Sequence, residues 1–352
     1  MNSLAFCLRP GFRKHKKVAI SSAGWLDETN KHLPILLNTE QLIVPKHRSH
    51  AEGCAGFVQW GILETDNSKA RLRGFAQDLR KPLAFIEDGF IRSLGIGLSK
   101  EPGRSIIIDD LGFYYDATKP SRLETILNSP RRFGWFRLFQ SKRAMRRIAQ
   151  KRVSKYNDAP LTLPPSLARP RDRKRILVLD QRAGDASIKG ALANELSFVL
   201  MLDHALKQDA DVFVKIHPDA LQGGKMSAMS LALMNFQDDA DLNIVSESVN
   251  PYVLFSAVDE VYTVASGMGF EAVIAGLPVH CFGVPYYAGW GFTIDHVKVP
   301  RRTARRSPEE VFYVAWMMLS RYVDPRTKRL CSVAAATKRI ARDVKRYQAR
   351  KT

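Results

Sequence analysis

A short apolar run that stops abruptly in polar residues constrains the fold of this chain more than any other feature. Residues 176–179 (Ile-Leu-Val-Leu) have the composition of a buried parallel strand. Polar side chains follow the run at once, namely Asp180, Gln181, Asp185 and Ser187. Because ligands of open α/β sheets bind beyond the carboxyl ends of the strands, this stretch marks the expected mouth of a site. On spacing alone, Asp185 is either a catalytic carboxylate or the N-cap of a strand-to-helix turn.

Short apolar segments alternate with helical ones in both halves of the chain, which predicts an α/β fold of two Rossmann-like domains with the ligand cleft between them. Strands are expected at residues 18–22, 57–61, 83–89, 105–109, 176–179, 210–217, 242–245, 260–264 and 279–282. Helices are expected at residues 68–80, 131–155, 191–208, 225–236, 251–257 and 270–275, and a further helix begins at a capping box formed by Ser121 and Glu124.

Proline composition places the domain boundary. Residues 159–172 are proline-rich and read as a linker, which separates a first domain at residues 1–158 from a second domain at residues 173–306. The remaining residues, 307–352, are expected to form a basic helical tail.

The charge of the chain is strongly basic. Lys and Arg number 54 against 35 Asp and Glu, a formal net charge of +19 that predicts attraction to polyanions. No nucleic-acid recognition module accompanies this charge, so we expect no nucleic-acid partner. Residues 131–155 hold ten basic residues and no acidic one, interleaved with apolar side chains that include Phe133, Trp135, Phe136 and Phe139. This segment is either a membrane-surface helix or an interdomain helix with a solvated basic face.

The compartment and the redox state follow from what the sequence lacks. No run of about 18 apolar residues predicts a membrane span, and the apolar segment at the N-terminus is too short for a secretory signal, so we expect a cytoplasmic protein. The four cysteines, Cys7, Cys54, Cys281 and Cys331, show neither C-x-x-C pairing nor metal-type spacing. We therefore expect them to be reduced and structural, and we expect no metal.

Two further strand ends carry groups that suit an anionic ligand. Lys215 and His217 end the strand expected at 210–217; the imidazole either binds a phosphate or a carboxylate, or is structural. Residues 266–271 (Ser-Gly-Met-Gly-Phe-Glu) begin a helix, where free N–H groups and the helix dipole attract an anion. Within this stretch, Glu271 either binds the hydroxyl pair of a ribose or only stabilises the dipole.

The first domain offers a matching strand end. Glu87, Asp88 and Gly89 close the strand expected at 83–89 and mirror the polar stretch at 180–185. Carboxylates from two facing domains suit acid/base or nucleophilic chemistry on a sugar. The alternative is a plain Asp-Gly turn.

Taken together, these stretches resemble the capsule-polysaccharide biosynthesis and export proteins of the KpsC/LipB type, which are bacterial β-Kdo glycosyltransferases. The resemblance runs in order over residues 57–295 and rests on Trp60-Gly61, 87–95, 109–110 with 114–117, Gln181-x-x-x-Asp185-Ala186-Ser187, Lys215-x-His217-Pro218-Asp219, 266–272, 278–283 and 287–291.

This resemblance implies a GT-B-like fold, a CMP-β-Kdo donor and retention at the anomeric carbon. It makes Asp185 the expected nucleophile, and we infer that Glu87 is the acid/base residue. It implies CMP contacts from His217, Ser266 and Glu271, and we expect further donor or nucleotide contacts from Gln181, Lys215, Gly267 and Gly269. Arg92 or Lys215 is expected to pair with the carboxylate of the donor.

The chain departs from the family in two respects. The best-known members hold two transferase modules, whereas this chain has room for one, and Arg182-Ala183-Gly184 stands where more acidic residues are expected. A single-linkage enzyme is therefore expected.

The expected partners are CMP-Kdo, a lipid or glycolipid acceptor, the anionic surface of the inner membrane, and other capsule synthesis or export proteins. Peripheral attachment to that membrane from the cytoplasm fits this set. Two alternatives stay open: a non-catalytic export or assembly partner, and a GT-B transferase that uses another nucleotide sugar.

Overall fold

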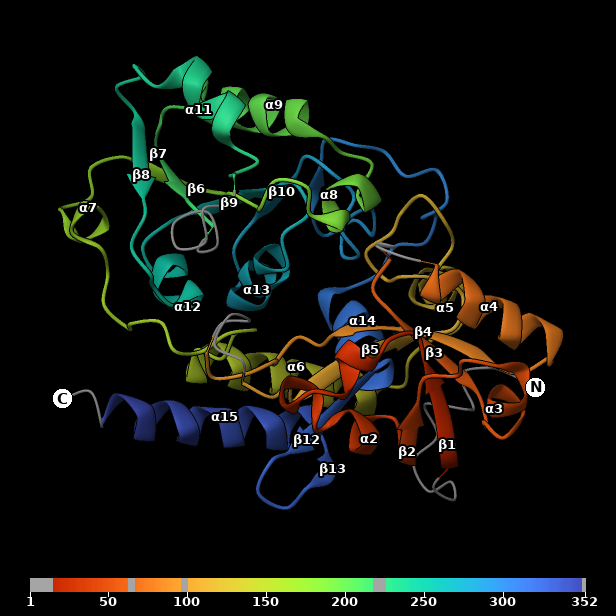
Figure 1. The fold of residues 1–352 in the computed structure, drawn as a ribbon. Coiled ribbons are helices and arrows are strands. Elements are labelled where there is room, and N and C mark those ends of the chain that lie inside the picture. Colours follow the sequence, from red (N-terminus) through yellow and green to blue (C-terminus); the bar gives the residue numbers. More distant parts are fainter. Residues whose placement is uncertain (1–14, 63–66, 96–100, 218–225, 350–352) are drawn as a thin grey trace.

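Two β-sheets, one above the other in Figure 1, organise the computed structural model of the protein. The structure describes residues 15–62, 67–95, 101–217 and 226–349. The predictions for Pro218 and Asp219 lie outside these residues.

The first sheet has seven strands in the order β13-β12-β5-β4-β3-β1-β2. The strands β2, β1, β3 and β4 pair in parallel. The other three pairs are antiparallel: β4 with β5, β5 with β12, and β12 with β13. Their bounds are β1 His15–Ile20, β2 Thr39–Ile43, β3 Phe57–Trp60, β4 Leu83–Asp88, β5 Ser105–Asp109, β12 Ser320–Asp324 and β13 Arg329–Cys331.

The second sheet has six strands, all parallel, in the order β11-β10-β9-β6-β7-β8. Their bounds are β6 Lys174–Leu179, β7 Ala210–Lys215, β8 Leu242–Val245, β9 Glu260–Thr263, β10 Val279–Cys281 and β11 Ile294–Asp295. The central strands β6 and β7 are buried on both faces, which explains their continuous apolar runs.

Helices cover both sheets (Figure 1). Those before the second sheet are α2 Leu33–Leu36, α3 Arg48–Glu52, α4 Ser68–Asp78, α5 Arg122–Asn128, α6 Trp135–Lys151 and α7 Pro165–Ala168, with short 3₁₀ turns η1 Ala23–Leu26 and η2 Glu28–Asn30. Those within it are α8 Ala186–Gly190, α9 Glu195–Leu206, α11 Ser230–Phe236, α12 Pro251–Phe255 and α13 Met268–Ala275. The last are α14 Pro308–Phe312, a π-helical turn η4 Tyr313–Met318, and α15 Val333–Gln348. The predicted α/β fold of two Rossmann-like sheets with a C-terminal helix is confirmed.

The C-terminal segment differs from the helical tail expected over 307–352. Only α14, η4 and α15 are helical there, because β12 and β13 extend the first sheet beyond β5. The buried Trp316 anchors this return: it stacks on Phe90 with ring centroids 4.5 Å apart, and its Nε1–H donates to the Tyr286 hydroxyl at 3.2 Å. Pairing with the otherwise open edge of β5 outweighed the local helical pattern.

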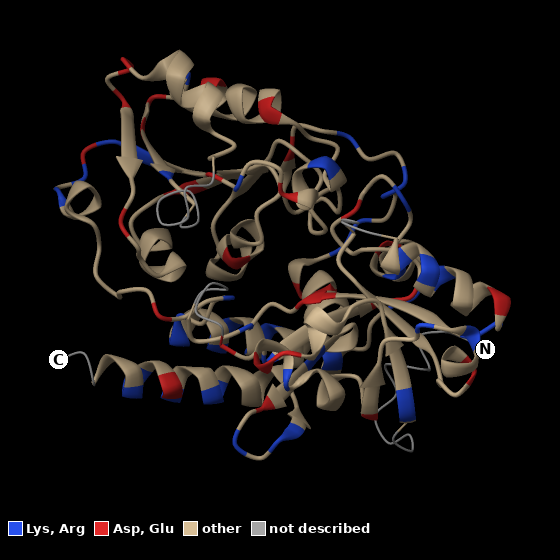
Figure 2. Ribbon diagram, viewed as in Figure 1, with Lys and Arg blue, Asp and Glu red and all other residues tan. Residues whose placement is uncertain are grey.

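The helix α6 decides part of the question left open for the basic segment. It buries Ser141, Ala144, Met145 and Ile148 and packs against α13, α14 and α15, so it is an interdomain helix. Figure 2 shows Lys and Arg gathered on α6 and along α15. The first turns of α6 nevertheless expose Trp135, Phe136 and Phe139. Among the described residues, no helix combines the length and the apolarity that crossing a bilayer requires.

The predicted capping box at α5 forms only in part. The Ser121 side chain accepts from the Glu124 backbone N–H, as expected. The buried Glu124 carboxylate instead accepts from Arg301 at 2.8 Å and Arg302 at 3.3 Å, in the segment that returns from the second domain. The carboxylate therefore joins the two domains, because two arginines, of which Arg302 is buried, compete for it more strongly than a backbone N–H does.

Candidate active site

The carboxyl ends of β6 and β7 are joined by Asp180. Its Oδ2 accepts from the His217 backbone N–H at 3.0 Å, and its Oδ1 accepts from the Ser227 hydroxyl at 2.8 Å and the Met229 N–H at 3.2 Å. The side chain is buried, so these hydrogen bonds replace the water it loses. Asp180 thus holds the backbone of His217 at the predicted mouth of the site.

Gln181 ties together the two other segments that were expected to meet there. Its Oε1 accepts from the Ala265 N–H at 2.8 Å, directly before Ser266. Its Nε2 donates to the Ser187 hydroxyl at 3.3 Å, two residues after Asp185. The predicted residues Gln181, Asp185, His217 and Ser266 therefore gather at one edge of the second sheet.

Asp185 is the N-cap of α8. Its Oδ1 accepts from the Ser187 N–H at 2.8 Å, and its side chain is half-buried. The capping interpretation is thus correct, and it leaves Oδ2 for a second role. The far end of α8 rests on the first domain, where the Gly190 carbonyl accepts from the Ala117 N–H at 2.7 Å. A side chain at Gly190 would place its Cβ 2.9 Å from the Tyr115 carbonyl oxygen, so glycine is required for this contact.

Glu87 ends β4 on the side of the first domain. Its Oε1 accepts from the Trp60 indole N–H at 3.1 Å, and its Oε2 accepts from the Tyr115 hydroxyl at 3.4 Å. Burial, and then the negative charge of Asp88, raise the pKa of the Glu87 carboxyl, against the opposing effects of Lys155 and of the hydrogen bonds. A narrow recess enclosing about 150 Å³ of empty space adjoins Glu87 and Tyr114.

Tyr114 lines the same recess as Glu87. Burial raises the pKa of its hydroxyl above the ordinary range; Lys155 opposes that rise, and the charges of Glu87, Asp88 and Asp185 add to it. Tyr114 therefore belongs to the charged surroundings of the candidate site.

Lys155 is a member of this group that the sequence analysis missed. Burial disfavours its ammonium, but Tyr156, Asp88, Tyr114 and Glu87 outweigh that effect and raise the pKa of Lys155. In the sequence, Lys155 is the last of the basic residues in the run 131–155 and does not stand out from them. In the structure it follows α6 instead of lying on it, which separates it from the basic residues of the helix.

The helix start at 266–271 presents a close-packed turn. The Ser266 hydroxyl accepts from the Met268 N–H at 3.3 Å, and the Ser266 carbonyl accepts from the Tyr287 hydroxyl at 2.6 Å. Gly267 is the exposed N-cap of α13. Gly269 lies under Tyr287, because a Cβ at this position would be 2.1 Å from the Tyr287 oxygen.

Glu271 faces the first domain instead of the helix start. Both of its carboxylate oxygens lie 2.9 Å from the Ser154 hydroxyl, and Oε1 also accepts from the Lys155 N–H at 3.2 Å. Burial raises the pKa of Glu271 to about 7, although these hydrogen bonds and the charge of Lys155 oppose the rise. The observed contacts of Glu271 join α13 to the residues that follow α6, and its predicted contact with a nucleotide stays a prediction.

The two cations predicted to meet the donor carboxylate differ in their surroundings. The Arg92 guanidinium is nearly buried and donates to Asp88 at 3.0 Å and to the Glu101 carbonyl at 3.3 Å. Lys215 is buried and donates to the Ile216 carbonyl at 2.7 Å. Burial lowers the pKa of Lys215 to about 8, with Glu247 and Asp180 opposing the shift. Arg92 is already paired with a carboxylate, whereas the observed partner of Lys215 is a backbone carbonyl. Lys215 is therefore the better placed of the two to pair with an added anion.

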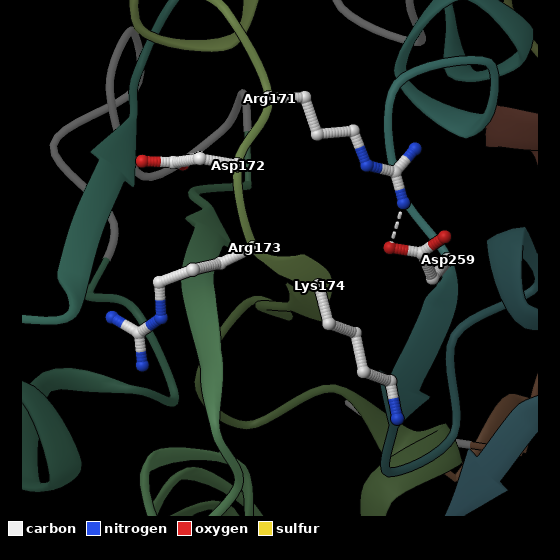
Figure 3. A pocket seen from close by; sticks show the side chains of 5 residues that line it. All are labelled: Arg171, Asp172, Arg173, Lys174 and Asp259. Carbon is white, nitrogen blue, oxygen red and sulfur yellow. Dashed lines mark ion pairs between the residues drawn. The ribbon is translucent and has the colours of Figure 1, made fainter.

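A shallow pocket of about 460 Å³ lies at the opposite edge of the second sheet, where β6 and β9 begin (Figure 3). Its lining side chains are paired: Arg171 with Asp259, and Arg173 with Asp209 at 2.9 Å. Lys174 pairs with Glu260 at 2.8 Å. This pocket carries balanced charge away from the strand ends that hold the predicted site residues.

Comparison with known proteins identifies the family of the chain. The family model described as "Capsule polysaccharide biosynthesis protein" matches residues 57–159 and 132–323. The capsule polysaccharide modification protein LipA of Neisseria meningitidis serogroup A is 39% identical over 285 residues, which cover 78% of this chain and 40% of LipA. The lipopolysaccharide-processing protein LpsZ of Rhizobium meliloti is 36% identical over 274 residues, 76% of this chain and 59% of LpsZ. The chain thus spans about two-fifths to three-fifths of the length of these relatives.

Two solved structures are also similar. The β-Kdo 2,4 transferase of Thermosulfurimonas dismutans KpsC is 33% identical with a TM-score of 0.82, and the match covers 93% of this chain and 98% of that one. The β-Kdo 2,7 transferase of the same organism's KpsC is 27% identical with a TM-score of 0.65, and covers 93% and 99%.

Proposed function

Because the chain belongs to the capsule polysaccharide biosynthesis family, we propose that it is a glycosyltransferase that moves Kdo from CMP-β-Kdo to a saccharide or lipid-linked acceptor with retention at the anomeric carbon. The observation that carries this proposal is the near-complete match to the β-Kdo 2,4 transferase. The positions of Glu87 at the end of β4 and of Asp185 after β6 support it, because a retaining transferase needs carboxylates on both sides of the sugar.

In the first step, Asp185 Oδ2 attacks the anomeric carbon of the donor. The bond from that carbon to the CMP phosphate oxygen breaks, CMP leaves with the electron pair, and a glycosyl ester forms on Asp185. The Ser187 N–H holds Oδ1, so the capping hydrogen bond aims the second oxygen at the sugar.

The departing CMP carries negative charge that the second sheet is suited to accept. The exposed start of α13 at Gly267 offers backbone N–H groups and the positive end of the helix dipole. His217, held through its backbone by Asp180, and Lys215 complete this anion site. These groups stabilise the leaving phosphate without a catalytic metal.

In the second step, Glu87 removes the proton from the acceptor hydroxyl as that oxygen attacks the glycosyl ester. The ester bond breaks, Asp185 regains its carboxylate, and the second displacement restores the original anomeric configuration. The two carboxyl groups should approach within about 5–6 Å in the closed state.

The test is incubation of the protein with CMP-Kdo, generated in situ because the nucleotide sugar is labile, and with a phosphatidylglycerol-type glycolipid acceptor. Formation of a Kdo-extended product supports the proposal. Transfer from a UDP-sugar instead would identify a transferase of different donor class. Binding of acceptor without turnover would favour a non-catalytic export partner. In a simpler assay, CMP should raise the unfolding temperature and UDP should not.

We also propose that the aromatic start of α6 attaches the protein to an anionic membrane surface, where a lipid-linked acceptor resides. Trp135 is 79% exposed and Phe136 is 56% exposed, beside Arg131 and Arg132. Amphipathic aromatic and basic residues favour the bilayer interface. Changing Trp135 and Phe136 to Ser should weaken binding to phosphatidylglycerol vesicles at least about tenfold. Met234→Ser on α11, which removes a side chain that is 71% exposed, is the matched control; equal binding by both variants would refute the docking role.

A further inference from the structure

Three histidines that are distant in the sequence meet on the face of the second sheet that α9 covers. His204 lies in the last turn of α9, His280 is in the middle of β10, and His296 follows β11. One ring nitrogen from each lies within 4.8 Å of the other two. Three of the eight histidines of the chain thus converge from separate elements.

Stacked aromatic side chains hold the imidazoles in place. Tyr262 stacks on His280 with centroids 4.2 Å apart, and Phe282 stacks on His296 at 4.0 Å. The His204 ring lies edge-on to His296 at 4.7 Å. The rings therefore cannot turn away from one another without breaking these contacts.

The spacing of the nitrogens suits one ion. His280 Nδ1 and His296 Nε2 are 3.2 Å apart. Two nitrogens bound tetrahedrally to one zinc ion at about 2.0–2.1 Å lie about 3.3 Å apart. On the other side of the same ring, His280 Nε2 faces Glu260 Oε2 at 3.6 Å. A carboxylate behind a histidine is the arrangement that orients metal-binding imidazoles.

The hydrogen bonding of the cluster agrees with a metal ligand set. Among the described residues, the buried Nδ1 of His204 has no hydrogen-bond partner.

We propose that His204, His280 and His296 form a site for a divalent transition-metal ion, Zn²⁺ in the first place. Imidazole ligands favour zinc and its neighbours in the first transition row over magnesium or calcium. His296 is exposed, so the fourth coordination position faces solvent and takes a water molecule.

The site would stabilise the path of the chain back to the first domain. The metal would bind α9 to the segment that carries β10 and β11. That segment continues into Arg301 and Arg302, which donate to Glu124 of the first domain. The role is structural, and it is separate from the proposed transfer chemistry at Asp185.

The test uses the full chain purified without a polyhistidine tag. Elemental analysis should find about one zinc ion per chain, and the chelator-treated protein should regain one equivalent in calorimetric titration with ZnCl₂. Substituted Co²⁺ should show the visible absorption of a low-coordinate nitrogen site. Removing the metal should lower the unfolding temperature.

His296→Ala is the decisive variant because, of the three side chains, His296 is the exposed one. The variant should bind Zn²⁺ at least about 100-fold more weakly, since losing even an outer partner of a ligand costs 10–100-fold. His280→Gln should behave in the same way. His47→Ala, which removes an exposed histidine outside the cluster, should bind like the parent. Absence of zinc binding by the parent at micromolar concentrations, or equal binding by the His296 variant, would overturn the proposal.

Discussion

The polar edges of the two sheets that meet at the proposed site differ in the kind of group they present. The first domain contributes ionisable side chains in confined surroundings, with the pKa of Glu87 and that of Lys155 both raised. The second domain contributes polar groups that hydrogen bonds hold in place: Ser266, whose carbonyl accepts from Tyr287; Asp185, which accepts from the Ser187 N–H; and His217, whose backbone N–H donates to Asp180.

This difference suggests that the two domains have separate chemical roles. Groups whose pKa is shifted by burial and by neighbouring charges suit proton transfer, which we assign to the first domain. A rigid array of N–H donors at strand ends and helix starts suits a phosphate, which we assign to the second. Asp185 is the exception, since it belongs to the second domain and we assign it the nucleophilic step.

The largest effect expected is at Asp185. Asp185→Asn should lower transfer at least about 1,000-fold because the amide cannot form the glycosyl ester. Asn is as good an N-cap as Asp, so its unfolding free energy should match the parent. Asp185→Ala should lose the activity and also about 1 kcal/mol of stability through the lost cap. Product assays and urea unfolding separate the two roles, and Asn-variant turnover within tenfold of the parent would contradict the nucleophile assignment.

The next effect tests proton transfer by the first domain. Glu87→Gln should lower kcat about 100- to 10,000-fold, the range of a lost general base. Trp60→Phe keeps the carboxylate but removes the indole N–H that donates to its ionised form. It should therefore raise the pKa of Glu87 further and move the acidic limb of the kcat profile to higher pH. Identical profiles for Trp60→Phe and the parent would remove Glu87 from this role.

Glu271 tests the contact between the domains through pH. Its folded-state pKa is raised to about 7, so the folded protein binds this proton more tightly than the unfolded chain does. The stability that results is present below about pH 4.5 and is lost as the pH rises through 7. In Glu271→Gln this loss should be absent, so the difference in unfolding free energy between variant and parent should change by up to about 3 kcal/mol between pH 4 and pH 8.

The control for this measurement is Glu195→Gln, which changes an exposed carboxylate in the first turn of α9. Its stability should follow the parent across the same range. A flat difference between Glu271→Gln and the parent would show that Glu271 does not bury its charge in solution.

The smallest effect concerns Lys215, which we assign to the phosphate site together with His217. Lys215→Gln should weaken CMP binding about tenfold, as expected for a lost charged hydrogen bond. Because the pKa of Lys215 is lowered to about 8, CMP affinity of the parent should fall as the pH rises through 8, and that of the variant should not. Lys207→Gln on α9, whose side chain is 71% exposed, should titrate like the parent in calorimetry. A parent affinity independent of pH between 7 and 9 would exclude Lys215 from the site.

Much of the fold was predictable because local signals and tertiary structure agree. Each strand expected from an apolar run is present, and the polar residues after 176–179 do meet Ser266 because parallel strands end at one edge. The strands β12 and β13 were not predictable, since their existence depends on pairing with β5 far back in the sequence. Lys155 and the three clustered histidines were not predicted as site residues for the same reason, because only folding brings them beside their neighbours.

The return of β12 to the first sheet makes the second domain an insertion within the first. Two segments of the chain, residues 159–172 and 297–307, therefore connect the two domains. Cutting the chain at the proline-rich stretch would not yield two autonomous pieces, because the shorter product would leave the edge of β5 bare and prone to aggregate.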